Sequence, residues 1–212
     1  MTTMQITSRM RWAGLAASVG GLTAIVMTPP FATAYFLAFS GEDALPIWFN
    51  SVAPRLDSLL TFSSRNGVYE TYGRIYNLVY LLYLPLVLAL HHLHDQTPSR
   101  LEKRGYVVLM AGLIATTVGV AGDYWANGIG FPIEVLGLLA MIVGVTMYGL
   151  ALRRSSVVPQ RWAWMFLACG PGALVSMGLI GHIPSGPTLP FALVWLVVGS
   201  MLLLSKGIRQ LT

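Results

Sequence analysis

Charged side chains interrupt the apolar segment at residues 68–84, which has the sequence VYETYGRIYNLVYLLYL. Glu70 and Arg74 stand four residues apart, the spacing at which side chains on one helical face meet, and Asn77 continues that face. Ion pairing lowers the cost of the two charges in a weakly polar site, although both groups must still be desolvated. Because charged residues inside membrane segments usually face the interior and mark functional paths, we take this stripe as part of a candidate site.

Ionisable side chains from three other apolar segments are predicted to reach a similar level. At about 1.5 Å per helical residue, Asp123 and Glu134 lie roughly 28 Å from the basic ends of their segments, and His182 lies roughly 31 Å from its own. By the same count from His91, Glu70 lies roughly 31 Å and Arg74 roughly 25 Å along their own segment. Groups from four segments are therefore expected to gather near one edge of the hydrocarbon. The alternative is that side chains at segment ends are simply hydrated.

Carboxyl groups in such a place can perform acid–base chemistry. A partly desolvated acid can donate a proton, and Glu134 is the first candidate because it has no basic neighbour in the sequence. Asp123 and Glu70 are the other catalytic candidates, with Arg74 placed to hold Glu70 ionised. The predicted ligand-binding residues lie at the same level or on the same face: Arg74, Asn77, Tyr72, Tyr76, Tyr124, Trp125 and His182.

Five tyrosines share one face of the same segment, being spaced by three or four residues: Tyr69, Tyr72, Tyr76, Tyr80 and Tyr83. A stripe of this kind more often packs against neighbouring helices than lines a ligand site. Small residues in the first and fifth segments also indicate close packing between helices.

The segments that must position these residues are long and apolar. Of 212 residues, 55% are hydrophobic and 10% are charged, against about 25% charged in a soluble domain. Runs of roughly 20 apolar residues match the hydrocarbon core, and the alternation of a membrane β-barrel is absent. We predict an all-α, polytopic integral membrane bundle, one domain over 1–212, with six transmembrane helices at about 12–38, 67–91, 105–123, 131–152, 162–182 and 188–205.

The basic residues predict the orientation of this bundle. Most Lys and Arg residues fall on one side of a six-span arrangement, which the positive-inside rule assigns to the cytoplasm. Both termini are therefore expected to be cytoplasmic (N-in/C-in), in a multi-pass protein of the cell (inner or plasma) membrane. Of the acids, only Asp95 and Glu102 are placed on that side. The basic residues concerned are ten of thirteen: Arg9, Arg11, Arg100, Lys103, Arg104, Arg153, Arg154, Arg161, Lys206 and Arg209.

The first outer loop, residues 41–65, is the only long connection in this arrangement. We predict a short amphipathic helix there, lying at the outer interface and weakened by Pro54. A cap folded over the mouth of the bundle is the alternative. The apolar residues at helical spacing are Leu45, Trp48, Phe49, Val52, Leu56, Leu59 and Leu60.

The first segment has two interpretations. Its basic start, its apolar run and the Ala-Thr-Ala sequence at 32–34 resemble a signal peptide with a cleavage site, whereas its length favours a retained span. Pro29 and Pro30 are expected to break or bend its outer half, because each removes a backbone donor.

Several classes of function are disfavoured. The basic residues form short clusters between apolar runs rather than a basic soluble surface, which argues against nucleic-acid binding. A single cysteine, Cys169, excludes an internal disulfide. The HHLHD run at 91–95 offers metal-ligand spacing, but a helix end carrying partial positive charge beside lipid headgroups is the favoured interpretation. We predict no metal and no cofactor.

These observations favour a small membrane protein with an outward-facing polar and acidic pocket for an apolar ligand, such as a lipid or isoprenoid. Acid–base catalysis of a cyclisation or isomerisation is the candidate reaction. The first alternative is a non-catalytic accessory or regulatory subunit, bound to another membrane protein or to copies of itself. The second is a transporter component, which is disfavoured because the inner halves of spans three to six are nearly all apolar. Membrane lipid is the expected partner throughout.

Overall fold

The computed structural model describes residues 7–40, 45–93, 99–126, 128–155 and 158–204, and the backbone of two short strands. Those strands, β1 (Thr3–Met4) and β2 (Ile208–Arg209), pair antiparallel beside the termini. Six helices are long and apolar enough to cross a membrane, which confirms the predicted set. The largest difference in bounds is at the start of the third helix, which begins at Arg100 rather than at residue 105. The helices are α1 (Ser8–Phe39), α4 (Arg65–Leu93), α5 (Arg100–Trp125), α6 (Phe131–Arg154), α7 (Gln160–Ile180) and α8 (Ser185–Leu204).

The six helices form a closed ring in chain order. Each long helix packs against the next along the chain, and α8 returns to pack on α1. Helices α4 and α8 also meet across the centre, where the indole N–H of Trp195 donates to the carbonyl of Tyr83 at 3.0 Å. Large buried side chains fill this centre, including Tyr76, Tyr80 and Phe166.

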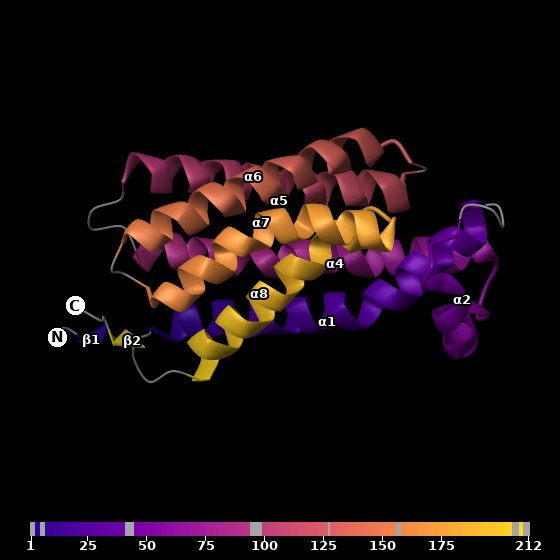
Figure 1. Ribbon diagram of the computed structural model, residues 1–212, viewed down its shortest axis with the longest axis horizontal. Helices are drawn as coiled ribbons and strands as arrows, with labels where there is room; N and C mark the ends of the chain where they lie inside the picture. Colours follow the sequence, from indigo (N-terminus) through magenta and orange to yellow (C-terminus); the bar gives the residue numbers. More distant parts are fainter. Residues whose placement is uncertain are drawn as a thin grey trace.

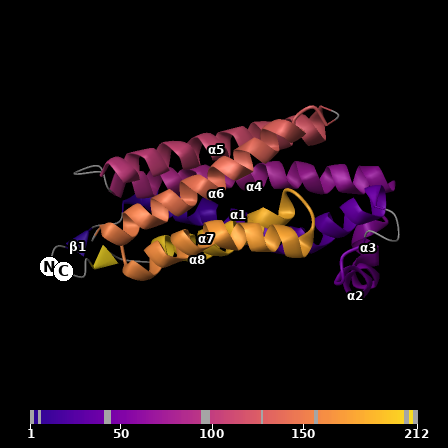
Figure 2. The same cartoon turned by 45° about the horizontal axis from the view of Figure 1, so that its top comes forward.

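The two ends of the bundle differ in charge. One end holds both termini and the α4–α5 and α6–α7 connections, and the other holds the remaining connections (Figures 1 and 2). We call the first the basic end, because the described part of the chain places there Arg9, Arg11, Arg100, Lys103, Arg104, Arg153, Arg154 and Arg161. We call the second the acidic end, because it carries four of the acids, Asp57, Glu70, Asp123 and Glu134, together with only three arginines, Arg55, Arg65 and Arg74.

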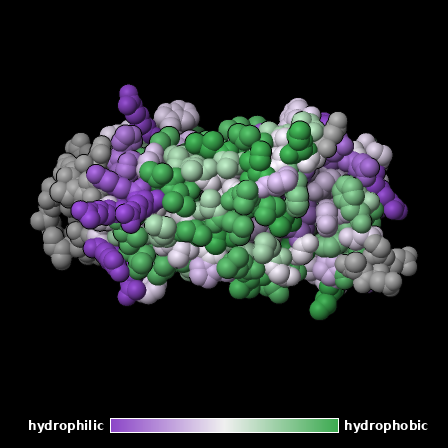
Figure 3. All heavy atoms as spheres, turned by 90° about the horizontal axis from the view of Figure 1, so that it is seen from above, coloured by the Kyte–Doolittle hydropathy of each residue, from purple (hydrophilic) through white to green (hydrophobic). Residues whose placement is uncertain are grey.

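Hydrophilic residues gather at both ends, with a hydrophobic band between them (Figure 3). This distribution is the one expected for a bundle whose middle lies in hydrocarbon. Some predicted positions lie outside the described residues, namely His94, Asp95 and Lys206, as does the side chain of Arg209.

Local sequence sets several helix ends. The Ser99 side chain accepts the backbone N–H of Glu102 at 3.1 Å, as N-cap residues do at the start of a helix. Pro132 lies in the first turn of α6, where the missing N–H is tolerated. Helix α7 ends at Gly181, whose φ of 73° lies in the left-handed region that favours glycine. This turn places His182 at the acidic end.

Helices α5 and α6 approach closely because glycines recur every seven residues along their shared face. A Cβ atom at Gly112 would lie 2.5 Å from the backbone nitrogen of Met141, and one at Gly119 would lie 2.2 Å from that of Glu134. Side chains would therefore force these helices apart. The glycines concerned are Gly105, Gly112 and Gly119 in α5, and Gly137 and Gly144 in α6.

The connection between α1 and α4 is made of short pieces rather than the single helix that the sequence predicts. They are α2 (Phe49–Val52), the 3-10 helix η2 (Ala53–Leu56) and α3 (Asp57–Leu60). Pro54 lies in the first turn of η2, where the helix type changes. The Trp48 indole N–H donates to the Leu179 carbonyl at 3.2 Å, and the Tyr72 hydroxyl donates to the Leu59 carbonyl at 2.7 Å. The connection is thus attached to α7 and α4.

Helix α1 continues through Pro29 and Pro30 as one helix, and it changes direction in this half rather than breaking (Figure 1). Its Thr28 hydroxyl bonds the Tyr76 hydroxyl of α4, and its Phe31 is fully buried. Helix α1 thus packs on both α4 and α8.

Candidate functional site

A pocket of about 280 Å³ opens at the acidic end, between the end of α1, the start of α4 and the α5–α6 turn. Its walls carry two carboxyl groups, Glu70 and Asp123, and two phenol groups, Tyr69 and Tyr124. Glu70, Asp123 and Tyr124 are residues that the sequence assigns to a site, and they line this pocket together. The remaining lining residues are Phe39, Asn66 and Gly128.

Glu134 lies beside this pocket in the first turn of α6 and is completely buried. Neither of its carboxyl oxygens has a hydrogen-bond partner in the described part of the chain. Asp123, Tyr69 and Tyr124 lie within electrostatic range of it. Burying an unpaired carboxylate is costly, so this position suits a carboxyl group that carries its proton.

A chain of hydrogen bonds leads from the pocket wall to the α7–α8 connection. The hydroxyl oxygens of Tyr124 and Tyr69 lie 2.8 Å apart, and the Tyr69 oxygen lies 3.4 Å from Nε2 of His182. Nδ1 of His182 lies 2.8 Å from the hydroxyl of Ser185. Hydroxyl and imidazole groups both donate and accept, so the donor and acceptor roles along this series of hydrogen bonds can be exchanged. The Tyr124 ring fits because a Cβ at Gly73 would lie 2.1 Å from it.

Aromatic rings enclose His182. The ring centroids of Phe31 and Tyr35 lie 4.7 and 4.6 Å from that of the imidazole, and the Tyr69 ring lies 5.7 Å away. The side chain is 2% exposed, and burial lowers the pKa of His182 to about 3. The imidazole is therefore neutral at pH 7, with one ring nitrogen donating and the other accepting.

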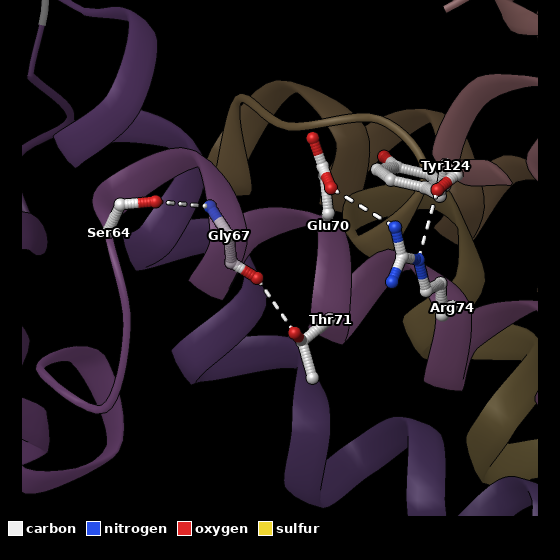
Figure 4. A network of polar contacts seen from close by, with 6 residues as sticks. All are labelled: Ser64, Gly67, Glu70, Thr71, Arg74 and Tyr124. Atoms are coloured by element: carbon white, nitrogen blue, oxygen red, sulfur yellow. Dashed lines mark hydrogen bonds and ion pairs between the residues drawn. The ribbon is translucent and has the colours of Figure 1, made fainter. Parts of the chain in front are cut away.

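Arg74 and Glu70 form the ion pair that their spacing predicts. Nη2 of Arg74 donates to Oε2 of Glu70 at 3.1 Å, and Nε of Arg74 donates to the Tyr124 carbonyl at 3.1 Å (Figure 4). The guanidinium also lies 5.0 Å from the centroid of the Trp125 ring. Since Tyr124 and Trp125 end α5, Arg74 supplies a donor and a positive charge where carbonyls lack helical partners.

The ion pair itself contributes little to stability, because its side chains are 42% and 49% exposed. Its main effect is geometric, since it holds the end of α5 against α4 and keeps the Glu70 carboxylate at the pocket wall. The charges of the opening segment thus lie at the polar edge of the bundle rather than deep in its apolar middle.

Three predicted ligand contacts have partners away from the pocket. Tyr72 bonds the α1–α4 connection, Tyr76 bonds Thr28 of α1, and the Asn77 amide donates to the carbonyl of Thr117 in α5 at 2.7 Å. None of the three is a pocket-lining residue, and Glu134, Arg74, Trp125 and His182 lie near the pocket without lining it. These contacts between elements are the packing role that the tyrosine spacing favours, and ligand contact by these residues stays a prediction.

At the basic end, His91 pairs with Glu102. Its Nδ1 lies 2.8 Å from Oε1 of Glu102, and its ring stacks on Tyr106 with centroids 3.7 Å apart. This pair joins the end of α4 to the start of α5. Among the described residues, no group of three or more His, Cys, Asp and Glu side chains could hold a metal ion. His94 and Asp95, the rest of that run, lie outside them.

The sequence predictions omit part of the pocket wall. Tyr69 is assigned only to the packing stripe, although it also lines the pocket. Asn66 lies three and four residues before Tyr69 and Glu70, so helical spacing alone could have added it. Ser185 follows His182 by three residues, but no sequence rule indicates that their side chains meet.

Comparisons of the chain with protein-family models, with curated proteins and with solved structures found no match. Function is therefore inferred from the geometry of the acidic end.

Proposed function

We propose that this chain is a multi-pass protein of the cell membrane that binds an apolar ligand, of lipid or isoprenoid type, at its acidic end. In this proposal the basic end faces the cytoplasm, as the positive-inside rule requires, and the pocket opens outward. The α1–α4 connection lies along the outer interface, with Phe49 and Leu60 packed on the bundle and Ile47 and Leu59 exposed toward lipid.

The pocket fits one end of such a ligand. Its volume of about 280 Å³ is near the lower limit for small-molecule sites, roughly 300 Å³, so most of a lipid would lie outside it. Phe39 at the pocket wall and Trp125 beside Arg74 are both largely exposed. Exposed aromatic side chains at this level are typical of a membrane edge, so the ligand can enter sideways from the outer leaflet.

The observation that carries the proposal is the buried carboxyl of Glu134, which has no hydrogen-bond partner among the described residues and lies within electrostatic range of the pocket-lining Asp123. As a general acid it would give its proton to a double bond or carbonyl of the ligand. Loss of a proton from a neighbouring carbon to Asp123, with Glu70 as the second candidate base, then yields an isomer or a cyclised product of unchanged composition. Return of that proton to Glu134 resets the site. Arg74, Tyr124, Trp125 and His182 would position the ligand's polar end.

Lipid mass spectrometry tests this proposal. The protein is purified from its own membrane, and co-purifying lipids are compared between the wild type and the Glu134→Gln and Arg74→Ala variants. We expect a lipid enriched over the bulk membrane in the wild type and lost in both variants at normal expression. Glu102→Gln, a change at an equally buried acid of the basic end, should retain it. An unchanged lipid complement in Glu134→Gln would overturn the proposal.

The second candidate is a non-catalytic accessory or regulatory subunit, partnered by another membrane protein or by copies of itself. It is favoured by the use of Tyr72, Tyr76 and Asn77 in contacts between elements rather than at the pocket. The absence of any enriched lipid in the wild type would decide for this candidate. A transporter component ranks third, since the inner halves of the predicted spans three to six, which leave out the charged helix ends at Arg100–Arg104 and Arg153–Arg161, are nearly all apolar.

A further inference from the structure

A second hollow lies at the basic end of the bundle, between the start of α1 and the end of α4. It has a volume of about 610 Å³ and is more than twice as large as the acidic-end pocket at about 280 Å³. No residue lines both hollows, so an inference drawn here is independent of the proposed function. The lining residues are Thr7, Arg9, Met10, Trp12, Ala13, Pro85, Leu88, Ala89 and His92.

The lining changes from polar to apolar along the helices. Thr7 and Arg9 lie at the start of α1, and His92 lies at the end of α4, so the polar side chains share the basic end. From His92 to Pro85, the groove follows α4 for about 10 Å toward the middle of the bundle. Its deeper wall is made of Ala13, Ala89 and Pro85. An amphiphile with a polar head and an apolar chain matches this order.

The charge at the mouth of the groove selects an anion. Arg9 is exposed and has no acidic partner in the described part of the chain. Arg11, two residues further along α1, is also exposed but does not line the groove. The first turn of α1 contains no acidic residue, so its positive dipole end is not offset by a side chain. Trp12 is 70% exposed, as is typical of a side chain at the headgroup level.

We propose that this groove binds one anionic phospholipid of the leaflet at the basic end. Its phosphate lies against Arg9, and one acyl chain follows the groove between Ala13 and Ala89 toward Pro85. The small side chains at Ala13 and Ala89 provide the space for that chain. A zwitterionic lipid of the same chain length binds more weakly, because its net charge is zero.

Native mass spectrometry of the delipidated full chain tests the proposal, with dioleoylphosphatidylglycerol and dioleoylphosphatidylcholine as the probes. We expect one bound phosphatidylglycerol in preference to phosphatidylcholine, and Arg9→Gln should weaken its binding by about fivefold, the effect of one basic side chain at an anionic surface. Arg104→Gln removes an exposed charge at the same end but outside the groove, and should change binding little. Equal binding of the two lipids, or an equal loss in Arg104→Gln, would overturn the proposal.

Two further arms test the groove itself. Ala89→Phe should weaken the binding of both lipids, because its ring fills the path of the acyl chain. If that variant fails to fold, Leu88→Trp at the lipid-facing edge of the groove replaces it in the same test. Free glycerol phosphate should not compete with phosphatidylglycerol, and competition would show a phosphate site instead of a lipid site. Glu134→Gln should leave phosphatidylglycerol binding unchanged, which separates this groove from the acidic-end pocket.

Discussion

At the scale of single residues, Glu134 and Glu102 are both buried acids, but their surroundings differ. Glu102 pairs with His91 at 2.8 Å, whereas Glu134 has no partner for either oxygen among the described residues. An unpaired buried polar group costs on the order of 1–3 kcal/mol. Glu134→Leu should therefore raise the free energy of unfolding by about that amount, while abolishing ligand binding. A dye that reacts with the thiol of the buried Cys169 reports unfolding.

Glu102→Leu supplies the contrast, because it removes the partner of His91 and should destabilise the protein. If Glu134→Leu were destabilised as strongly as Glu102→Leu, then Glu134 would have a structural role and the case for a stored proton at the pocket would be lost. Retained stability together with lost binding is the pattern expected of a functional acid in a site that folding alone does not require.

His182 predicts a dependence of stability on pH. Its pKa falls from the ordinary 6.5 to about 3 on burial, so below pH 6.5 the unfolded chain binds a proton that the folded chain does not. Stability therefore falls as pH falls through 6.5 and levels off near pH 3. Between pH 7 and pH 5, this residue should remove about 2 kcal/mol. Thermal unfolding of the wild type and His182→Gln across this range measures the effect, and an equal slope in both would contradict it.

The site could be predicted from the sequence only in part. Counting along helices placed Asp123, Glu134 and His182 at one level, and the i, i+4 rule gave the Glu70–Arg74 pair. Counting does not fix how each helix is rotated about its axis. For that reason it could not show that Tyr69 would reach His182, or that Glu134 would remain without a partner.

At the scale of elements, the glycine repeat on α5 and α6 predicts an asymmetric response to alanine. Gly112→Ala should lower the free energy of unfolding by about 1–3 kcal/mol, the usual cost of overpacking, because its Cβ would meet the α6 backbone at 2.5 Å. Gly178→Ala in α7 has nothing within 4 Å of the new Cβ and should be neutral or gain up to about 1 kcal/mol from helix propensity. The Cys169 dye assay compares them. Similar effects in both variants would contradict this account of the interface.

Helix existence was the most predictable feature of these elements, because each span is a long apolar run bounded by charged or turn residues. The α1–α4 connection was less so. Apolar residues at helical spacing predicted one helix, but Pro54 and the contacts of Trp48 and Tyr72 divide it into short pieces. Tertiary hydrogen bonds of this kind leave no periodic signal in the sequence.

At the scale of the whole molecule, the two ends of the six-helix ring carry different kinds of side chains. The closure of α8 on α1 brings both termini to the basic end, and alternating connections leave the acidic end with Asp123, Glu134 and His182. The acidic end therefore holds a buried carboxyl group, Glu134, that has no hydrogen-bond partner among the described residues. The basic end holds exposed basic side chains beside an apolar groove. These are the two places where an amphiphile could meet the bundle from opposite leaflets.

This division predicts which end meets the cell exterior. In a Cys169→Ala background, Ser58→Cys lies in the exposed α1–α4 connection and Lys103→Cys lies exposed at the basic end. A membrane-impermeant maleimide should label the first in intact cells and the second only after permeabilisation, because positive residues are retained in the cytoplasm. The reverse pattern would place the pocket inside the cell and the anionic-lipid groove in the outer leaflet. Labelling of both from one side would contradict a bundle in which these two ends lie on opposite faces of the membrane.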